Sequence, residues 1–154
     1  MSPVPLHLSH QPIFVIDDYE EKDGRYTGNT DAKGLSLGLP QWDESDGISL
    51  KIWRHTGVKW SRQSEEIPVH RALDLTLLFL LAILARKNGT NTESISCGDL
   101  NIQAKIPIVP KQDQDAERLH RMLGLLSQYL EEEKDTIRDR LTAISEVLKK
   151  LGVS

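Results

Sequence analysis

The stretch that decides the fold is Leu35-Ser-Leu-Gly-Leu-Pro-Gln-Trp-Asp-Glu-Ser-Asp-Gly-Ile-Ser-Leu-Lys-Ile-Trp53. Apolar residues alternate with small or polar ones at its two ends, residues 35–39 and 48–53. This period of two predicts two β-strands, each with a buried apolar face. Asp46-Gly47 between them is a turn signal. We therefore expect Ser49, Lys51 and Trp53 on the face opposite the apolar side chains.

The flanking sequence extends this pair of strands. The short apolar run 13–16 predicts a strand before it, and Val58, Trp60 and Arg62 share one face of a segment after the His55-Thr-Gly57 turn. Strands at 35–39, 48–53 and 58–62, joined by turns, predict an antiparallel meander. The residues before position 13, which include His7 and His10, are expected to be extended and mobile.

An apolar helix is expected next. Ser64-Glu-Glu-Ile-Pro68 combines a capping hydroxyl, acidic residues and an early proline, which is typical of a helix start, and Asn88-Gly89 is typical of a helix end. The apolar run from Leu73 to Ala85 is shorter than the ~20 residues of a membrane span. We therefore expect a buried helix over 65–88 and no membrane insertion.

The last part of the chain predicts helix with a heptad. Residues 89–114 are expected to form a loop, with a possible edge strand where apolar residues alternate from Ile102 to Ile108. Residues 115–152 are expected to form one long helix or a helical hairpin that breaks near 131–135. Apolar residues recur there every seven positions, at Leu123, Leu130, Ile137, Ile144 and Leu151. This recurrence favours a homodimer or higher homo-oligomer, although packing on the protein's own sheet would also explain it.

Together these elements predict an α+β fold in a single domain over residues 1–154: a small antiparallel sheet packed against an apolar helix and a long C-terminal helix or helix pair. The net charge of -4 argues against wholesale binding to nucleic acid or to anionic membranes. Cys97 is the only cysteine and no signal peptide is evident, so we expect a cytoplasmic protein. The chain has no spacing typical of a metal site, a phosphate loop or a catalytic motif, and no cofactor is expected.

The candidate site is the region 51–71. Five cationic residues there stand against Glu65 and Glu66, a local charge of +3 in an otherwise acidic chain. Arginines can grip phosphate or carboxylate, and tryptophan rings can stack on a planar group. We expect a non-enzymatic protein that binds a small anionic ligand, such as a nucleotide-derived signal. The candidate residues are Lys51, Trp53, Arg54, His55, Trp60, Arg62, Ser64, His70 and Arg71, with Arg25 and Lys33 from a preceding polar loop.

Three alternatives stay open. Trp53 or Trp60 could belong to the core, with the arginines paired to nearby carboxylates. An enzyme acting on a phosphorylated small molecule could use His70 oriented by Asp74, or His55, as its acid or base. A protein-interaction or inhibitor module could work through the C-terminal helix.

The segments Asn29–Trp42, Lys51–Glu66 and His70–Asp74 are also similar to a family of small bacterial proteins of unknown function. The resemblance covers about residues 15–85. It implies no established activity, and no functional residue can be transferred from it.

Overall fold

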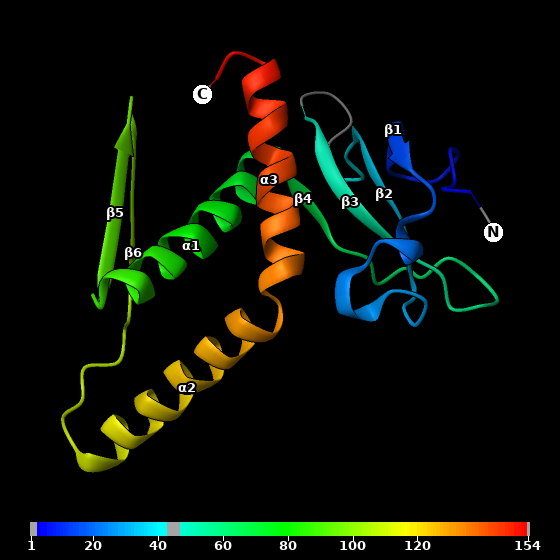
Figure 1. Ribbon diagram of the computed structural model, residues 1–154. Helices are drawn as coiled ribbons and strands as arrows, with labels where there is room; N and C mark the ends of the chain where they lie inside the picture. Colours follow the sequence, from blue (N-terminus) through cyan, green and yellow to red (C-terminus); the bar gives the residue numbers. More distant parts are fainter. Residues whose placement is uncertain (1–2, 43–46, 154) are drawn as a thin grey trace. The chain divides into compact units, whose positions relative to one another are not determined.

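A computed structural model describes residues 3–42 and 47–153 and shows an α+β fold. In the described residues, four strands form one antiparallel sheet, two further strands form a second, and there are three α-helices (Figure 1). The chain divides into two compact units, Met1–Phe79 and Leu80–Ser154, and each is described by itself. The single domain expected from the sequence stays a prediction.

The sheet of the first unit is an antiparallel meander, as expected, although its last strand is not the expected one. Its strands are β1 (Gln11–Ile16), β2 (Ala32–Leu39), β3 (Ser49–Arg54) and β4 (Glu66–Pro68), and they lie in that order with antiparallel neighbours. Two short 3₁₀ helices, η1 (Tyr19–Glu21) and η2 (Gly24–Tyr26), lie in the connection from β1 to β2. The turn expected at Asp46-Gly47 lies partly outside the described residues.

The prediction of a strand at 58–62 is wrong. After β3 the chain forms a single bridge between His55 and Trp60, and Val58 is 90% exposed. The place beside β3 is taken by β4, which pairs along Ser49–Lys51. The reason is that the ring of Trp60 packs edge-on against the rings of Trp53 and His55, so this residue serves the turn and not a strand face.

The buried face of β2 and β3 is the opposite of the one expected. Ala32, Gly34, Ser36 and Gly38 of β2 are buried, as are Ser49, Lys51 and Trp53 of β3, whereas the leucines of β2 are half-buried. The glycines explain this choice, because a Cβ at position 34 would collide with the Val4 side chain and one at 38 with the Gln11 backbone. Small residues thus let the N-terminal segment lie directly on this face.

Helix α1 (Val69–Asn88) begins four residues later than the expected start at 65. The two glutamates that were expected in its first turn are used elsewhere: Glu65 pairs with Arg54, and Glu66 accepts hydrogen bonds inside the first unit. The helix is also less buried than expected, since Leu81 and Ala85 are its only buried residues and Leu73, Leu75 and Leu78 are 50–61% exposed. In the described part of the chain, no helix has the length and apolarity of a membrane span.

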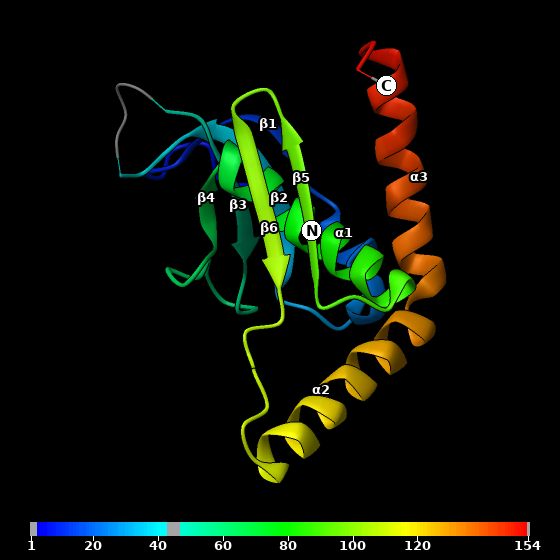
Figure 2. The same ribbon diagram turned by 90° about the vertical axis from the view of Figure 1, so that its left-hand side faces the viewer.

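The second unit contains a hairpin and two helices. Strands β5 (Thr92–Cys97) and β6 (Leu100–Lys105) pair antiparallel around a tight turn at Gly98, where a loop with one possible strand was expected (Figure 2). Gly98 has φ +59, a conformation that favours glycine. The C-terminal region forms two helices, α2 (Asp113–Glu132) and α3 (Lys134–Lys150), which meet at Glu133 inside the predicted break.

Candidate functional site

A buried polar cluster lies on the covered face of the first unit's sheet. His10, expected in a mobile tail, is 0% exposed. Its Nδ1 lies 2.8 Å from Glu66 Oε1, and its Nε2 lies 2.7 Å from Ser36 Oγ. Trp53 Nε1 donates to Ser36 Oγ at 2.8 Å, and the Ser49 hydroxyl donates to Glu66 Oε1 at 2.8 Å. Three strands, β2, β3 and β4, and the segment before β1 are thus tied together by one hydrogen-bonded network.

The order Ser36, His10, Glu66 is that of a nucleophile, a base and an orienting carboxylate. A substrate could not reach it, however, because Ser36 is 4% exposed and His10 belongs to the segment that covers the serine. Any movement that opened access to Ser36 would therefore remove its base. The cluster fastens His10 to the sheet.

Lys51 and Trp53 belong to this buried region. Trp53 is 2% exposed, so the alternative in which it is a core residue is the one the structure shows. The Lys51 ammonium group lies 4.1 Å from the centre of the Trp53 ring, a cation–π contact. Burial lowers the pKa of Lys51, and the neighbouring Glu66 carboxylate acts in the opposite direction. Neither side chain is presented to a ligand at the surface.

Arg54 points from the other face of β3 and is held by two carboxylates. Its Nε and Nη2 donate to Glu65, the shortest of these bonds at 2.7 Å, and its Nη1 donates to Asp31 Oδ1 at 2.5 Å. These bonds raise the pKa of Arg54, and the bond from Arg54 lowers the pKa of Glu65. Of the five N–H donors of a guanidinium group, the described bonds use three, which leaves two for another acceptor.

A cavity of about 470 Å³ lies beside Arg54, between the η1–η2 connection and β3. Its lining is polar and aromatic and consists of Tyr19, Asp23, Tyr26, Asn29, Thr30, Asp31, Ala32, Ile52 and Arg54. The loop before β2 therefore folds against the sheet. This is the arrangement that a contribution of Arg25 and Lys33 to the candidate site would need. Two of that loop's cations lie outside the lining: Lys33 pairs with Glu20 at 2.5 Å, and the Arg25 guanidinium lies 5.9 Å from the Tyr26 ring centre.

The remaining candidate residues are dispersed. His55 and Trp60 form a ring pair 5.0 Å apart, Ser64 is half-buried, and Arg62 and Arg71 are exposed. His70 lines a separate cavity of about 540 Å³ with Trp42, Ile48, Pro68 and Leu73 among its neighbours. His70, Arg71 and Asp74 are all described residues. Asp74 forms no ion pair with either of the other two. The structure thus brings Arg54 and His70 to two separate cavities, and it joins Lys51, Trp53, His55 and Trp60 by ring contacts.

Sequence reasoning missed both tyrosines of the Arg54 cavity. Tyr19 and Tyr26 stand in an acidic, turn-rich stretch with no periodicity to mark them. The available signal was their spacing around Asp23 and Gly24, which allows two consecutive 3₁₀ turns. Asn29 and Asp31 lie between Arg25 and Lys33, within the polar loop that the sequence analysis identified.

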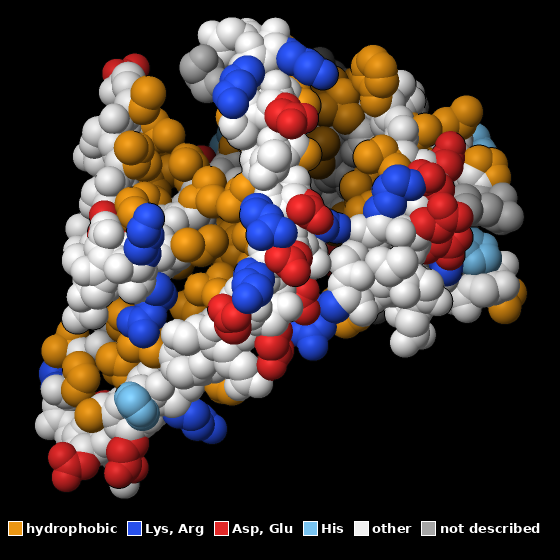
Figure 3. Space-filling model, in the orientation of Figure 1, with side chains coloured by type: hydrophobic (Ala, Val, Ile, Leu, Met, Phe, Trp, Pro, Cys, Tyr) orange, Lys and Arg blue, Asp and Glu red, His pale blue; other side chains and the backbone are white. Residues whose placement is uncertain are grey.

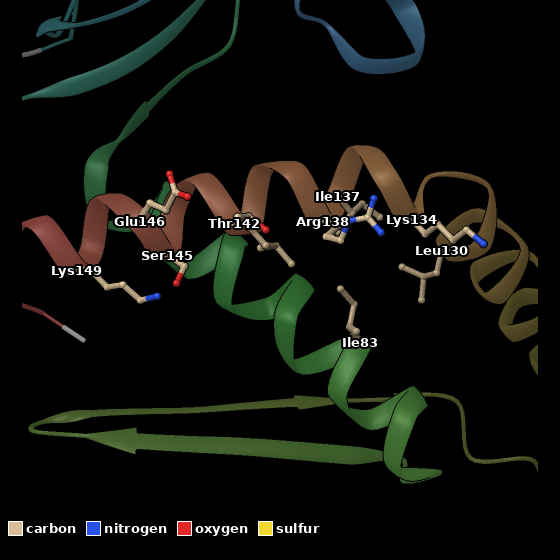
Figure 4. Close-up of a pocket in the computed structure, with 10 residues that line it drawn as sticks. Ile83, Leu130, Lys134, Ile137, Arg138, Thr142, Ser145, Glu146 and Lys149 are labelled. Atoms are coloured by element: carbon tan, nitrogen blue, oxygen red, sulfur yellow. The ribbon is translucent and has the colours of Figure 1, made fainter.

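The second unit has its own groove, of about 540 Å³. Its apolar floor is formed by Ile83, Leu130, Ile137 and Leu141, and Figure 4 shows Ile83 projecting from α1 toward α3. Polar and charged residues of α3, including Arg138, Ser145 and Lys149, complete the lining. Hydrophobic side chains also lie at the surface around the helices of this unit (Figure 3).

Comparison with known sequences places the protein in a family. Residues 1–153 match a family of unknown function, DUF6530, and the protein belongs to it. The resemblance to an uncharacterised family is therefore confirmed, and the match extends well beyond residues 15–85. No curated protein and no solved structure matches the chain.

Proposed function

We propose that the protein binds a small polar ligand in the Arg54 cavity and does not transform it. The observation that carries this proposal is the cavity itself, whose volume of about 470 Å³ is that of a small-molecule site. Two phenol rings, a guanidinium group and two carboxylates converge on it. Such a lining offers stacking surfaces, donors and acceptors within one space.

The chemistry of the lining suits recognition of a ligand. The groups that converge are aspartates, tyrosines, an amide, a hydroxyl and an arginine, and the lining includes no histidine, lysine or cysteine. An arginine remains protonated at any working pH and cannot serve as a general base. The bonds of Arg54 to Asp31 and Glu65 also hold its side chain in one orientation, which suits recognition.

Arg54→Ala tests the proposal. We expect it to weaken ligand binding by about 1.5–3 kcal/mol, because the charge-assisted donors disappear. The Arg54 side chain is 30% exposed and its partners Asp31 and Glu65 are 51% exposed, so the melting temperature should change little.

Arg62→Ala is the matched control, since Arg62 is exposed and lies outside the cavity. Native mass spectrometry of freshly purified protein measures the retained small molecule in all three proteins. Retention by the wild type and the Arg62 variant, with loss from the Arg54 variant, would support the proposal. Equal retention by all three would exclude this cavity as the site.

A second candidate function is an interaction module built on the C-terminal helices. Helices α2 and α3 bury no residue fully, although an amphipathic helix gains most of its stability by packing its apolar face. Ile144 and Val147 of α3, and Leu151 directly after it, are 46–69% exposed. A partner chain that covers this face would supply the missing packing, and a second copy of the protein is the simplest partner.

A further inference from the structure

We infer that the ligand of the Arg54 cavity is an uncharged nucleoside whose base carries both hydrogen-bond acceptors and N–H donors, as guanine does. This inference rests on the proposed function and adds the chemical class of the ligand. It also departs from the sequence-based expectation of an anionic ligand, for a reason that lies in the charges of the cavity.

The cavity does not favour a phosphate. Its ionisable lining has Asp23 and Asp31 against the single cation Arg54. The charge of Arg54 is already met by Asp31 at 2.5 Å and by Glu65 at 2.7 Å. A phosphate group would therefore enter a region with excess negative charge, which opposes its binding. An uncharged ligand meets no such penalty.

The donors and acceptors that remain suit a nucleobase edge. After its described bonds Arg54 keeps one N–H on Nη1 and one on Nη2, and these can donate to acceptors such as O6 and N7 of guanine. Asp31 binds Arg54 through Oδ1, so its Oδ2 can accept from a ring N–H or an exocyclic amino group. The Asn29 amide can both donate and accept. A base with both kinds of group satisfies all three residues.

The two tyrosines provide the apolar part of the recognition. Tyr19 and Tyr26 line the same cavity, and Tyr26 is 58% exposed; the Arg25 guanidinium lies over one face of its ring, so a stacking partner would use the other face. Every base has a π-face that can stack on an aromatic side chain. Asp23 and Thr30 are polar neighbours that can bind ribose hydroxyls. Aromatic surfaces beside hydroxyl-binding groups are what a nucleoside, with its flat base and polar sugar, requires.

Titration calorimetry with guanosine, adenosine and guanosine 5′-monophosphate tests the inference. On the wild type we expect guanosine to bind about tenfold or more tightly than its monophosphate, because the carboxylates repel the phosphate. Adenosine should bind more weakly than guanosine, since it offers a donor where guanine offers the O6 acceptor. Asp31→Asn should reduce the preference for guanosine over the monophosphate to within about threefold, because it removes one of the repelling charges.

Tyr26→Ala should weaken guanosine binding by about tenfold, in the range found for loss of one base–aromatic stack. Tyr129→Ala, at a half-exposed tyrosine of α2 in the second unit, is the matched control and should leave binding unchanged.

The outcomes separate this inference from the proposed function. Tighter binding of the monophosphate, abolished in Arg54→Ala, would overturn the uncharged ligand and keep the site. Absence of nucleoside binding, with another small molecule retained by the wild type and lost in Arg54→Ala, would overturn the nucleoside class alone. Absence of both nucleoside binding and any Arg54-dependent small molecule would overturn the site itself.

Discussion

Ser36 shows how much a single buried hydroxyl can organise. Its Oγ lies within hydrogen-bond distance of both His10 Nε2 and Trp53 Nε1, at 2.7 and 2.8 Å. When His10 donates to Glu66 through Nδ1, its Nε2 accepts from Ser36, and the serine in turn accepts from the indole. The His10 ring nitrogens, the Ser36 hydroxyl and the Trp53 indole N–H thereby find partners away from water, which is the condition for burying them without a large cost, whereas the buried Glu66 Oε2 has no partner among the described residues.

Ser36→Ala should lower the free energy of unfolding by about 1–3 kcal/mol, because the buried indole N–H and imidazole nitrogen lose their partner. Urea unfolding followed by tryptophan fluorescence measures the change. Ser94→Ala, at an exposed position of β5, is the control and should stay within about 0.5 kcal/mol of the wild type. A Ser36 variant as stable as the Ser94 variant would show that the network contributes nothing to folding.

At the same scale, the sequence could not place His10. A lone histidine in a proline-rich terminus has no periodicity, and its partners Ser36 and Glu66 lie 26 and 56 residues away. Arg54 was identified because its charge stands out locally. Its neutralisation by Asp31, 23 residues earlier, depends on tertiary structure that no local pattern encodes.

At the scale of the elements, alternation and turn signals located most strands but did not show which face of each strand is buried. The period of two correctly predicted β2 and β3, yet it could not say which face would be covered, since both faces alternate equally well. The close approach of residues 3–12 to Gly34 and Gly38 decided that choice. Likewise, the helix start predicted at Ser64–Pro68 is not formed. Residues 66–68 pair as β4 with β3 instead, because Glu66 gains buried partners there.

Gly38→Ala should destabilise the protein by about 1–3 kcal/mol, the usual cost of overpacking, because the new methyl group would meet the backbone of Gln11 and Pro12. Thermal and urea unfolding measure the effect. Gly124→Ala is the opposite control: it lies in α2 with no atom near the added Cβ, so it should stabilise the protein by about 0.4–1 kcal/mol. Equal effects of the two variants would contradict the close packing of β1 on β2.

At the scale of the whole molecule, the C-terminal helices leave an apolar face exposed in the single chain. The heptad of the C-terminal region correctly predicted helix, and the break near 131–135 was located at Glu133. The sequence could not decide between a partner copy and the protein's own sheet. An apolar stripe predicts that a helix face is buried, but it does not identify the surface that buries it. The exposure of Ile144, Val147 and Leu151 in the single chain is consistent with a homodimer.

We expect the wild type to be a dimer at tens of micromolar in sedimentation equilibrium. Ile137→Asp combined with Ile144→Asp should shift it to monomer or unfold it, because two carboxylates would enter the apolar face. Ala143→Asp, at an exposed position of the same helix, should leave the dimer intact. A wild type that remains monomeric at this concentration would refute the dimer, and circular dichroism would separate dissociation from unfolding.

The fastening of His10 to Glu66 also bears on the order in which the chain can fold during synthesis. His10 leaves the ribosome well before Glu66, because the carboxylate that His10 contacts is added 56 positions later. Contacts so distant along the chain close late, because the intervening loop must first lose its freedom. His10 therefore stays without its carboxylate partner until β4 has emerged, and the sheet of the first unit can be completed only after that.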